Sequence, residues 1–221
     1  MGFRKTIEHL VLKYLAVPRD PHVSPDKKHI ACIGDSITFG AGVQGKREKT
    51  WEYFLNRILG DEVQVLNYGI SGRTLRKEGD YPYTAEKFYD ISRKVRADIY
   101  LIMLGTNDAK PYNWNKDSYK EELLSFVKTY LMTGGEVILM TPPTCFPEEK
   151  TGVVAFDIDE ETVNGPVPEI VKEAGKELSL QVIDLSRFTE GHPEWFDDGV
   201  HPNEEGNKAI AGYIAEELKK K

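Results

Sequence analysis

The stretch His29-Ile30-Ala31-Cys32-Ile33, followed directly by Gly34-Asp35-Ser36-Ile37-Thr38-Phe39-Gly40, decides the fold and points to the chemistry. The apolar run predicts a buried strand bounded by glycine. A serine just past the end of a strand, flanked by glycines that allow unusual backbone angles, is well placed to present its hydroxyl to a cleft. Serine is a weak nucleophile by itself. It needs a histidine base, a group that orients the histidine, and hydrogen-bond donors for the oxyanion.

The composition is that of an ordinary globular protein with one fairly large domain. The chain has 221 residues, of which 40% are hydrophobic and 29% charged. A net charge of -7 disfavours nucleic acid and anionic membrane surfaces as partners. No apolar run approaches the roughly 20 residues of a membrane span, and no secretory apolar region opens the sequence. We therefore expect a cytoplasmic protein.

The first 28 residues are predicted to stand apart from the domain that follows. Apolar residues at helical spacing over residues 3–15 predict an amphipathic helix, and three prolines between residues 18 and 28 predict a linker. We expect this helix to pack on the body of the domain. A contact in a homo-oligomer is the main alternative, and a helix on a membrane surface is a weaker one. Residues 29–221 are predicted to form a single domain.

Short apolar runs alternate with helical patterns along the rest of the chain. Strands are predicted at residues 29–33, 63–67, 99–104, 137–140 and 181–185. Helices are predicted at residues 51–59, 84–96, 123–131 and 167–178, and a final helix contains Ile210, Tyr213, Ile214 and Leu218. Such alternation predicts one α/β domain with three α/β/α layers and a parallel sheet. The expected strand order is the flavodoxin-like 2-1-3-4-5, whose ligands bind beyond the carboxyl ends of the strands.

Five residues suited to acyl transfer fall in loops at that one edge of the predicted sheet. Ser36, Gly72 and Asn107 follow the first three strands, and Asp198 and His201 follow the fifth. The N–H groups of Ser36 and Gly72 and the amide of Asn107 could bind an oxyanion. Asp198 lies three residues before His201, a spacing that lets a carboxylate orient the imidazole. Of the five histidines, only His201 combines this edge with such an aspartate.

Four short blocks in this order resemble a known family. Gly34-Asp35-Ser36 with Gly40, Ser71-Gly72, Gly105-Thr106-Asn107-Asp108 and Asp198-Gly199-Val200-His201 resemble the blocks of the SGNH, or GDSL-type, esterases and acylhydrolases. The one departure is Ile37, where the motif that names the family has leucine. The resemblance implies a flavodoxin-like α/β/α fold and no cofactor. It implies Ser36 as nucleophile, Ser36, Gly72 and Asn107 as oxyanion donors, and His201 with Asp198 as base and orienting group.

Other interpretations of the same residues were weighed. Ser36 alone could cap a helix, and Asn107 alone could be a turn residue. A metal could bind a cluster of Asp197, Asp198, His201, Glu204 and Glu205, although both glutamates suit the first turn of a helix. The run from Gly40 to Gly45 matches a dinucleotide fingerprint but starts too late after its strand. The two cysteines form no metal spacing or disulfide framework, and Cys32 is expected to be a buried small apolar residue.

The substrate is the least determined feature. Tyr81, Tyr83, Tyr112, Trp114 and Trp195 lie in or beside the same loops and could stack on sugar rings, or could serve only in packing. The chain resembles the small bacterial branch of the family, which includes carbohydrate O-acetylesterases. This resemblance favours a short acyl group on a glycan or glycoside as the substrate. A lysophospholipase or thioesterase is the alternative within the family, and a non-catalytic glycan-binding module is the alternative from another class. The loop over residues 142–159 could act as a lid.

Overall fold

A computed structural model of the chain describes residues 20–43, 46–146 and 156–220. The amphipathic helix predicted at residues 3–15, with its proposed packing or oligomer contact, lies outside the described residues. So do residues 147–155, which are half of the loop proposed as a lid. No helix in the described part of the chain is both long and apolar enough to cross a membrane.

The centre of the molecule is a five-stranded parallel sheet. Its strands are β1 (Lys28–Gly34), β2 (Val63–Gly69), β3 (Ile99–Met103), β4 (Glu136–Met140) and β5 (Val182–Ile183), and their order is β2-β1-β3-β4-β5. The predicted flavodoxin-like topology is therefore confirmed. Ile30 pairs with Val65 on one side and with Ile99 on the other, which sets the register of the three strands that carry the site loops.

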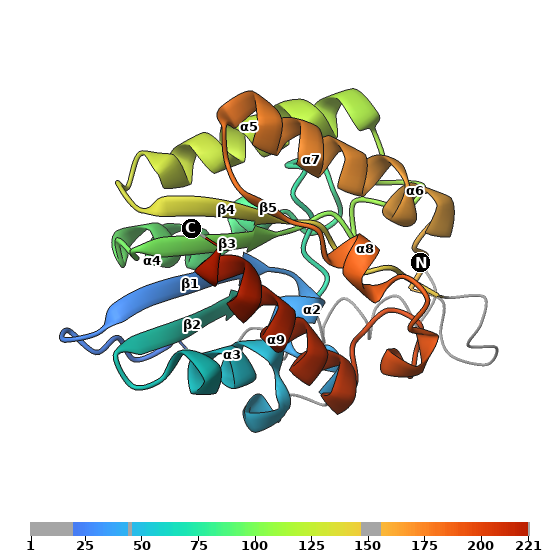
Figure 1. The fold of residues 1–221 in the computed structure, drawn as a ribbon. Coiled ribbons are helices and arrows are strands. Elements are labelled where there is room, and N and C mark those ends of the chain that lie inside the picture. Colours follow the sequence, from blue (N-terminus) through green and yellow to red (C-terminus); the bar gives the residue numbers. More distant parts are fainter. Residues whose placement is uncertain (1–19, 44–45, 147–155, 221) are drawn as a thin grey trace.

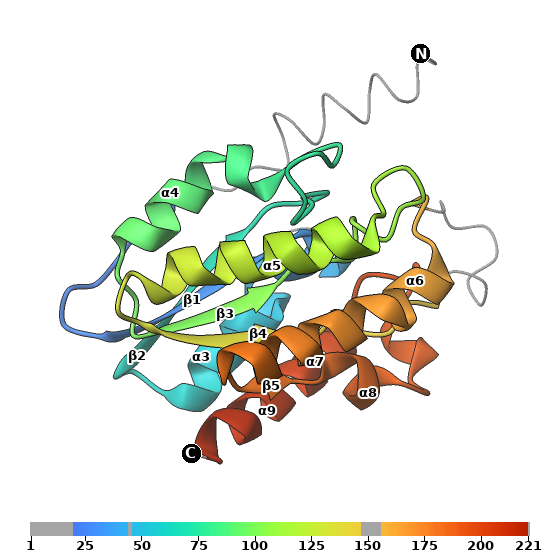
Figure 2. The ribbon, with the colours of Figure 1, turned by 90° about the horizontal axis from the view of Figure 1, so that it is seen from above.

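Helices and short 3-10 turns connect the strands. The α-helices are α2 (Ser36–Phe39), α3 (Trp51–Leu59), α4 (Lys87–Lys94), α5 (Lys116–Leu131), α6 (Glu160–Asn164), α7 (Pro166–Leu178), α8 (Leu185–Thr189) and α9 (Glu204–Lys219). The 3-10 turns are η2 (Ala41–Val43), η3 (Arg47–Lys49), η4 (Tyr83–Ala85) and η5 (Pro193–Trp195). Helices α4, α5 and α7 cover one face of the sheet, and α3 and α9 cover the other (Figures 1 and 2).

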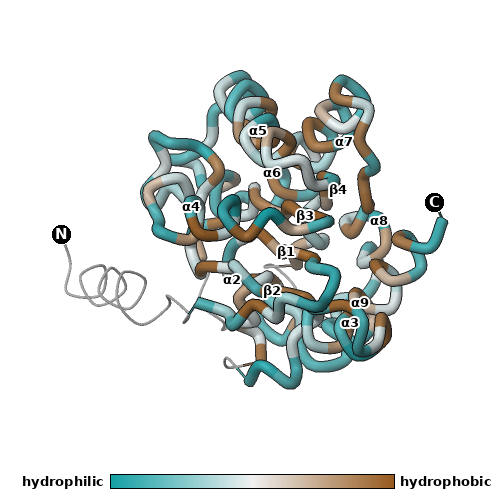
Figure 3. The backbone as a smooth tube through the Cα atoms, turned by 90° about the vertical axis from the view of Figure 1, so that its left-hand side faces the viewer, coloured by the Kyte–Doolittle hydropathy of each residue, from teal (hydrophilic) through white to brown (hydrophobic). Residues whose placement is uncertain are grey.

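Two hydrophobic cores fill the spaces between these layers. Alternate residues of β1 serve opposite faces, because successive side chains of a strand point to opposite sides. Ala31 and Ile33 belong to the core under α4, α5 and α7, whereas Ile30 and Cys32 belong to the core under α3 and α9. In Figure 3 the central strands are mainly hydrophobic, and the helices around them carry both hydrophobic and hydrophilic residues. Cys32 is fully buried, as predicted.

Side-chain caps explain where several helices begin. Asn115 accepts a hydrogen bond from the N–H of Ser118 and starts α5 seven residues before the predicted helix. Asp184 accepts one from the N–H of Arg187 and starts α8, which shortens β5 to two residues. Helices α6 and α8 were not predicted, because helices of five residues each are too short to show helical periodicity.

Candidate active site

Ser36, His201 and Asp198 form a hydrogen-bonded chain at the carboxyl edge of the sheet. His201 Nε2 lies 2.8 Å from Ser36 Oγ, and His201 Nδ1 lies 2.7 Å from Asp198 Oδ2. Ser36 and His201 are 8% and 7% exposed, so both are nearly enclosed. The structure thus brings together residues that are 165 positions apart in the sequence. The contacts are those of a nucleophile, a base and an orienting carboxylate.

The turn after β1 fixes the position of Ser36. Asp35 Oδ1 accepts a hydrogen bond from the N–H of Ile37 and caps α2, which begins at Ser36. Gly40 ends α2 in the left-handed conformation, with φ of 91°, and its N–H donates to the carbonyl of Ser36. Ser36 is therefore held at the start of a single helical turn, which Asp35 caps at its beginning and Gly40 at its end. Asp35 thus accepts a hydrogen bond from the backbone of its own loop.

Asp198 is bound entirely by its own loop. Its Oδ1 accepts the N–H groups of Val200 and His201 at 2.9 and 2.7 Å, while its Oδ2 faces the imidazole. Burial raises the pKa of Asp198, but the hydrogen bonds and charge of His201 and the N–H of Val200 outweigh it and leave the pKa below its usual value. The carboxylate stays ionised and can stabilise a protonated His201. Asp197 is exposed and accepts a hydrogen bond from Asn203 instead.

The three predicted oxyanion donors lie on three neighbouring loops. Gly72 has φ of 80°, a left-handed conformation that favours glycine. Ser36 is the first residue of α2. Across the described residues, no hydrogen bond engages the backbone N–H of either one. The amide of Asn107 donates to the carbonyl of Arg73 at 3.2 Å and to Asp35 Oδ2 at 3.4 Å. Asn107 is therefore fixed between the nucleophile loop and the Gly72 loop.

Two carboxyl groups are buried around Asn107. Burial raises the pKa of Asp35 to about 6, against hydrogen bonds from Ile37 and Thr106 and the charge of His201. Burial likewise raises the pKa of Asp108 to about 7, although two backbone N–H groups and the charge of Arg76 lower it. Desolvation of the charged form is the main cause for both groups. No role for Asp108 was predicted from the sequence.

Gly42 and Phe156 also contact the histidine and were not predicted. A Cβ on Gly42 would lie 2.9 Å from His201 Cβ and 2.3 Å from the carbonyl oxygen of Pro202. The ring of Phe156 meets the imidazole edge to face, with 5.0 Å between centroids. The rejected dinucleotide fingerprint therefore contains a glycine that serves close packing on His201. In the sequence, only the unusual density of glycines near Ser36 indicates close packing in this region.

The aromatic residues proposed to contact substrate have different environments. Tyr83 is fully buried, and its hydroxyl donates to the carbonyl of Tyr68, so the expectation that it stacks on a substrate is wrong. The sequence predicted Tyr83 in or beside a loop, but the residue begins η4 and its ring lies in the core. Trp195 stacks on His192 at 3.9 Å, and Trp114 packs against Tyr119 at 5.5 Å.

Tyr81 and Tyr112 complete the predicted aromatic set. The ring of Tyr81 is half-buried and lies beneath the guanidinium of Arg73, 5.7 Å from its centroid. Tyr112 is 58% exposed. Tyr81, Trp114 and Trp195 keep some exposed surface, so a contact between these three rings and a substrate stays a prediction.

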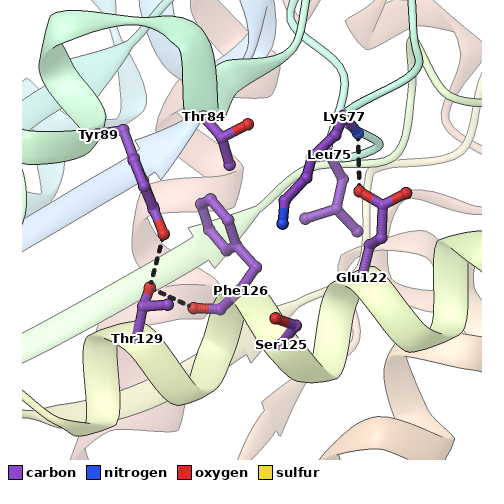
Figure 4. Close-up of a pocket in the computed structure, with 8 residues that line it drawn as sticks. All are labelled: Leu75, Lys77, Thr84, Tyr89, Glu122, Ser125, Phe126 and Thr129. Carbon is purple, nitrogen blue, oxygen red and sulfur yellow. Dashed lines mark hydrogen bonds between the residues drawn. The ribbon is translucent and has the colours of Figure 1, made fainter.

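A separate pocket of about 70 Å³ lies between η4, α4 and α5 (Figure 4). Lys77 extends its side chain between Leu75 and Phe126, while its N–H donates to Glu122. The residues that line the pocket are Leu75, Lys77, Thr84, Tyr89, Glu122, Ser125, Phe126 and Thr129. None of the predicted site residues is among them, so this pocket is distinct from the site around Ser36.

The metal-binding alternative was also compared with the geometry. Glu204 pairs with Lys49 and Lys208 at the start of α9 rather than turning to His201. Among the residues that the structure describes, no three His, Cys, Asp or Glu side chains are grouped so that they could hold a metal ion. Cys32 and Cys145 are both free and buried.

Comparisons with known proteins place this geometry among esterases. The chain is 31% identical to an acetylxylan esterase of Xylanibacter ruminicola over 94% of its own length, and it spans only 45% of that larger protein. It is 29% identical to an arylesterase of Vibrio mimicus, covering 89% of this chain and 91% of the relative.

A solved structure has the same fold at lower sequence identity. The carbohydrate acetylesterase Est24 from Sinorhizobium meliloti superposes with a TM-score of 0.71 and 19% identity, over 87% of this chain and 98% of its own. The family model of the GDSL-like lipases and acylhydrolases matches residues 32–209, a range that contains Ser36, Gly72, Asn107, Asp198 and His201. On that match over most of its length, the chain belongs to the GDSL-like lipase/acylhydrolase family.

Proposed function

We propose that the chain is a serine esterase that removes short acyl groups, acetyl above all, from a carbohydrate through an acyl-enzyme. The observation that carries this proposal is the chain of contacts from Ser36 Oγ to His201 Nε2 at 2.8 Å and from His201 Nδ1 to Asp198 at 2.7 Å. These distances allow direct proton transfer from the hydroxyl to the imidazole.

The reaction has two halves that use the same groups. Ser36 Oγ attacks the ester carbonyl as its proton passes to His201 Nε2, and Asp198 stabilises the imidazolium. The negative charge on the former carbonyl oxygen is bound by the donors of Ser36, Gly72 and Asn107. When the tetrahedral intermediate collapses, the alcohol leaves with the proton from Nε2. Water then attacks the acyl-enzyme by the same relay and releases the acid.

The carbohydrate substrate is supported by relatedness rather than by geometry. The acetylxylan esterase of Xylanibacter ruminicola matches 94% of this chain, including the site loops. An aromatic ring that keeps one exposed face beside the site can stack on a sugar, and Tyr81, Trp114 and Trp195 are the proposed rings. We propose residues 29–221 as the catalytic domain.

Replacing the nucleophile tests the reaction. We expect Ser36→Ala to lower kcat for p-nitrophenyl acetate by at least about 10³-fold, because a triad works as one unit. Circular dichroism and melting temperature should stay near those of the unmodified protein, since the hydroxyl makes its only side-chain bond to His201 in the described structure. A Ser36→Ala variant with full activity would contradict the assignment.

Substrate class requires a second comparison. We expect acetate release from acetylated xylan and faster turnover of acetyl than of octanoyl or thioester substrates. A preference for long acyl chains or thioesters would favour a lysophospholipase or thioesterase instead. If a fluorophosphonate does not label Ser36 and no ester is cleaved, the non-catalytic glycan-binding module becomes the better interpretation.

A further inference from the structure

The sheet alone does not fix the distance between two of the proposed oxyanion donors. Gly72 follows β2 and Asn107 follows β3, and these strands are not neighbours because β1 lies between them. The loop that carries Gly72 must therefore cross the end of β1 to reach Asn107. Contacts between the two loops, rather than strand pairing, have to set the separation of the two donors.

Asp108 makes the central contacts between these loops. Its Oδ2 accepts the N–H of Leu75 at 2.8 Å, and its Oδ1 accepts the N–H of Arg76 at 2.9 Å. Asp108 is fully buried, so both oxygens depend on these partners. The preceding residue, Asn107, donates to the carbonyl of Arg73 at 3.2 Å. Two consecutive residues of one loop thus bind three residues of the other.

We propose that Asp108 is a positioning residue for catalysis, whose carboxylate holds the loop of residues 71–76 against Asn107 so that the Gly72 N–H and the Asn107 amide point to one oxyanion. This inference rests on the proposed esterase function. Asp108 bonds backbone N–H groups of the neighbouring loop and acts through the two loops. Above its pKa of about 7, the ionised Asp108 carboxylate offers two acceptor oxygens to two adjacent N–H groups and brings no donor of its own.

The chemistry of the side chain predicts a specific defect. In Asp108→Asn the amide NH₂ replaces one acceptor, so the N–H of Leu75 or of Arg76 faces another donor and the loop has to shift. A displacement of about 1 Å at a catalytic group lowers the rate by about 10²-fold. Because the defect lies in the oxyanion site, transition-state binding should fall while substrate binding changes little.

The experiment compares Asp108→Asn with Asp98→Asn as a matched control. Asp98 also accepts a backbone N–H from a distant segment, that of His29 at 2.7 Å, but at the opposite edge of the sheet. We expect Asp108→Asn to lower kcat for p-nitrophenyl acetate by about 10- to 10²-fold, with KM changed by less than about 2-fold. Affinity for an alkylboronic acid, which forms a tetrahedral adduct with serine, should fall by a similar factor. Asp98→Asn should change none of these values.

Each alternative outcome leads to a definite conclusion. If Asp108→Asn is folded and its kcat and boronate affinity match those of Asp98→Asn, the positioning role is overturned. If it does not fold, the smaller Asp108→Ser is measured in the same way; failure of both to fold at 10 °C would make Asp108 a folding determinant and also overturn the proposal. A wild-type protein that cleaves no ester would contradict the esterase function itself, which is a distinguishable failure.

Discussion

At the scale of single residues, the site depends on close contacts that a motif cannot describe. The blocks around Ser36 and His201 identify both residues from the sequence, because spacing within a block is local. Gly42 lies outside the blocks, and Asp108 lies within one, but the partners of both are reached only after the chain folds, so the sequence assigns neither a role. Tyr83 shows the opposite error: an aromatic residue in a site loop can turn inward to fill the core.

Gly42 allows a direct test of packing on the histidine. In Gly42→Ala the new methyl would meet His201 Cβ and the carbonyl of Pro202 within 3 Å, so the histidine loop has to move away from Ser36. We expect kcat/KM for p-nitrophenyl acetate to fall by about 10- to 10²-fold.

Gly212 offers the matched control for this substitution. A Cβ on Gly212, within α9, would meet nothing within 4 Å. Gly212→Ala should keep full activity and raise the free energy of unfolding by roughly 0.5–1 kcal/mol, because alanine is the better helix former. Equal activity losses in the two variants would show that Gly42 has no special role.

At the scale of elements, the sequence predicted the strands better than the helix boundaries. Strands β1, β3 and β4 are short, almost wholly apolar runs, which is what burial on both faces requires. Helix starts depend on single caps such as Asn115, whose following residues are polar and carry no periodic signal. The short β5 and α8 meet at Asp184. The sequence predicted this residue to lie within a strand, but it caps α8.

Helix α3 contains a buried acid that should make stability depend on pH. Glu52 is 3% exposed, and neither of its carboxyl oxygens has a hydrogen-bond partner in the described structure. Burial raises the pKa of Glu52 well above its usual value. The folded state therefore keeps the proton that the unfolded state releases above pH of about 4.5. Stability from this group falls as pH rises through that window.

Glu52→Gln removes this titration. Relative to the unmodified protein, we expect the variant to gain stability between pH 5 and pH 8, by up to about 1.4 kcal/mol per pH unit until the folded-state pKa is passed. Urea unfolding at several pH values measures the difference. Glu48→Gln, at an exposed position, should give a constant difference. A pH-independent difference for Glu52→Gln would show that the carboxyl is already ionised in the folded protein.

At the scale of the whole molecule, the site joins the beginning and the end of the domain. Ser36 follows β1 while His201 precedes α9, and α3 packs against α9 beneath them. Asn207 ties these parts together: its Oδ1 accepts the N–H of Trp51 at 2.8 Å, and its Nδ2 donates to the carbonyl of Pro202 at 2.8 Å. It is buried, so both partners depend on it.

Asn207→Ala should therefore weaken fold and activity together. We expect the free energy of unfolding to fall by about 2–4 kcal/mol, because buried polar groups lose their partners. We also expect kcat to fall, since Pro202 adjoins His201. Chemical denaturation followed by circular dichroism and by esterase activity measures both. Lys208→Ala, next along α9 and exposed, should change stability by less than about 1 kcal/mol. Unchanged stability in Asn207→Ala would contradict this view of Asn207.

The loop from Asp198 to His201 has a consequence for how the site can be regulated. Its carboxylate binds the imidazole and two N–H groups of the same loop, so base and orienting group are held together within one loop. A displacement of this loop would carry both groups together and lengthen the distance from His201 Nε2 to Ser36 Oγ. The histidine would keep its tautomer throughout. Activity could then be interrupted and restored by translation alone, without rebuilding the acid–base pair.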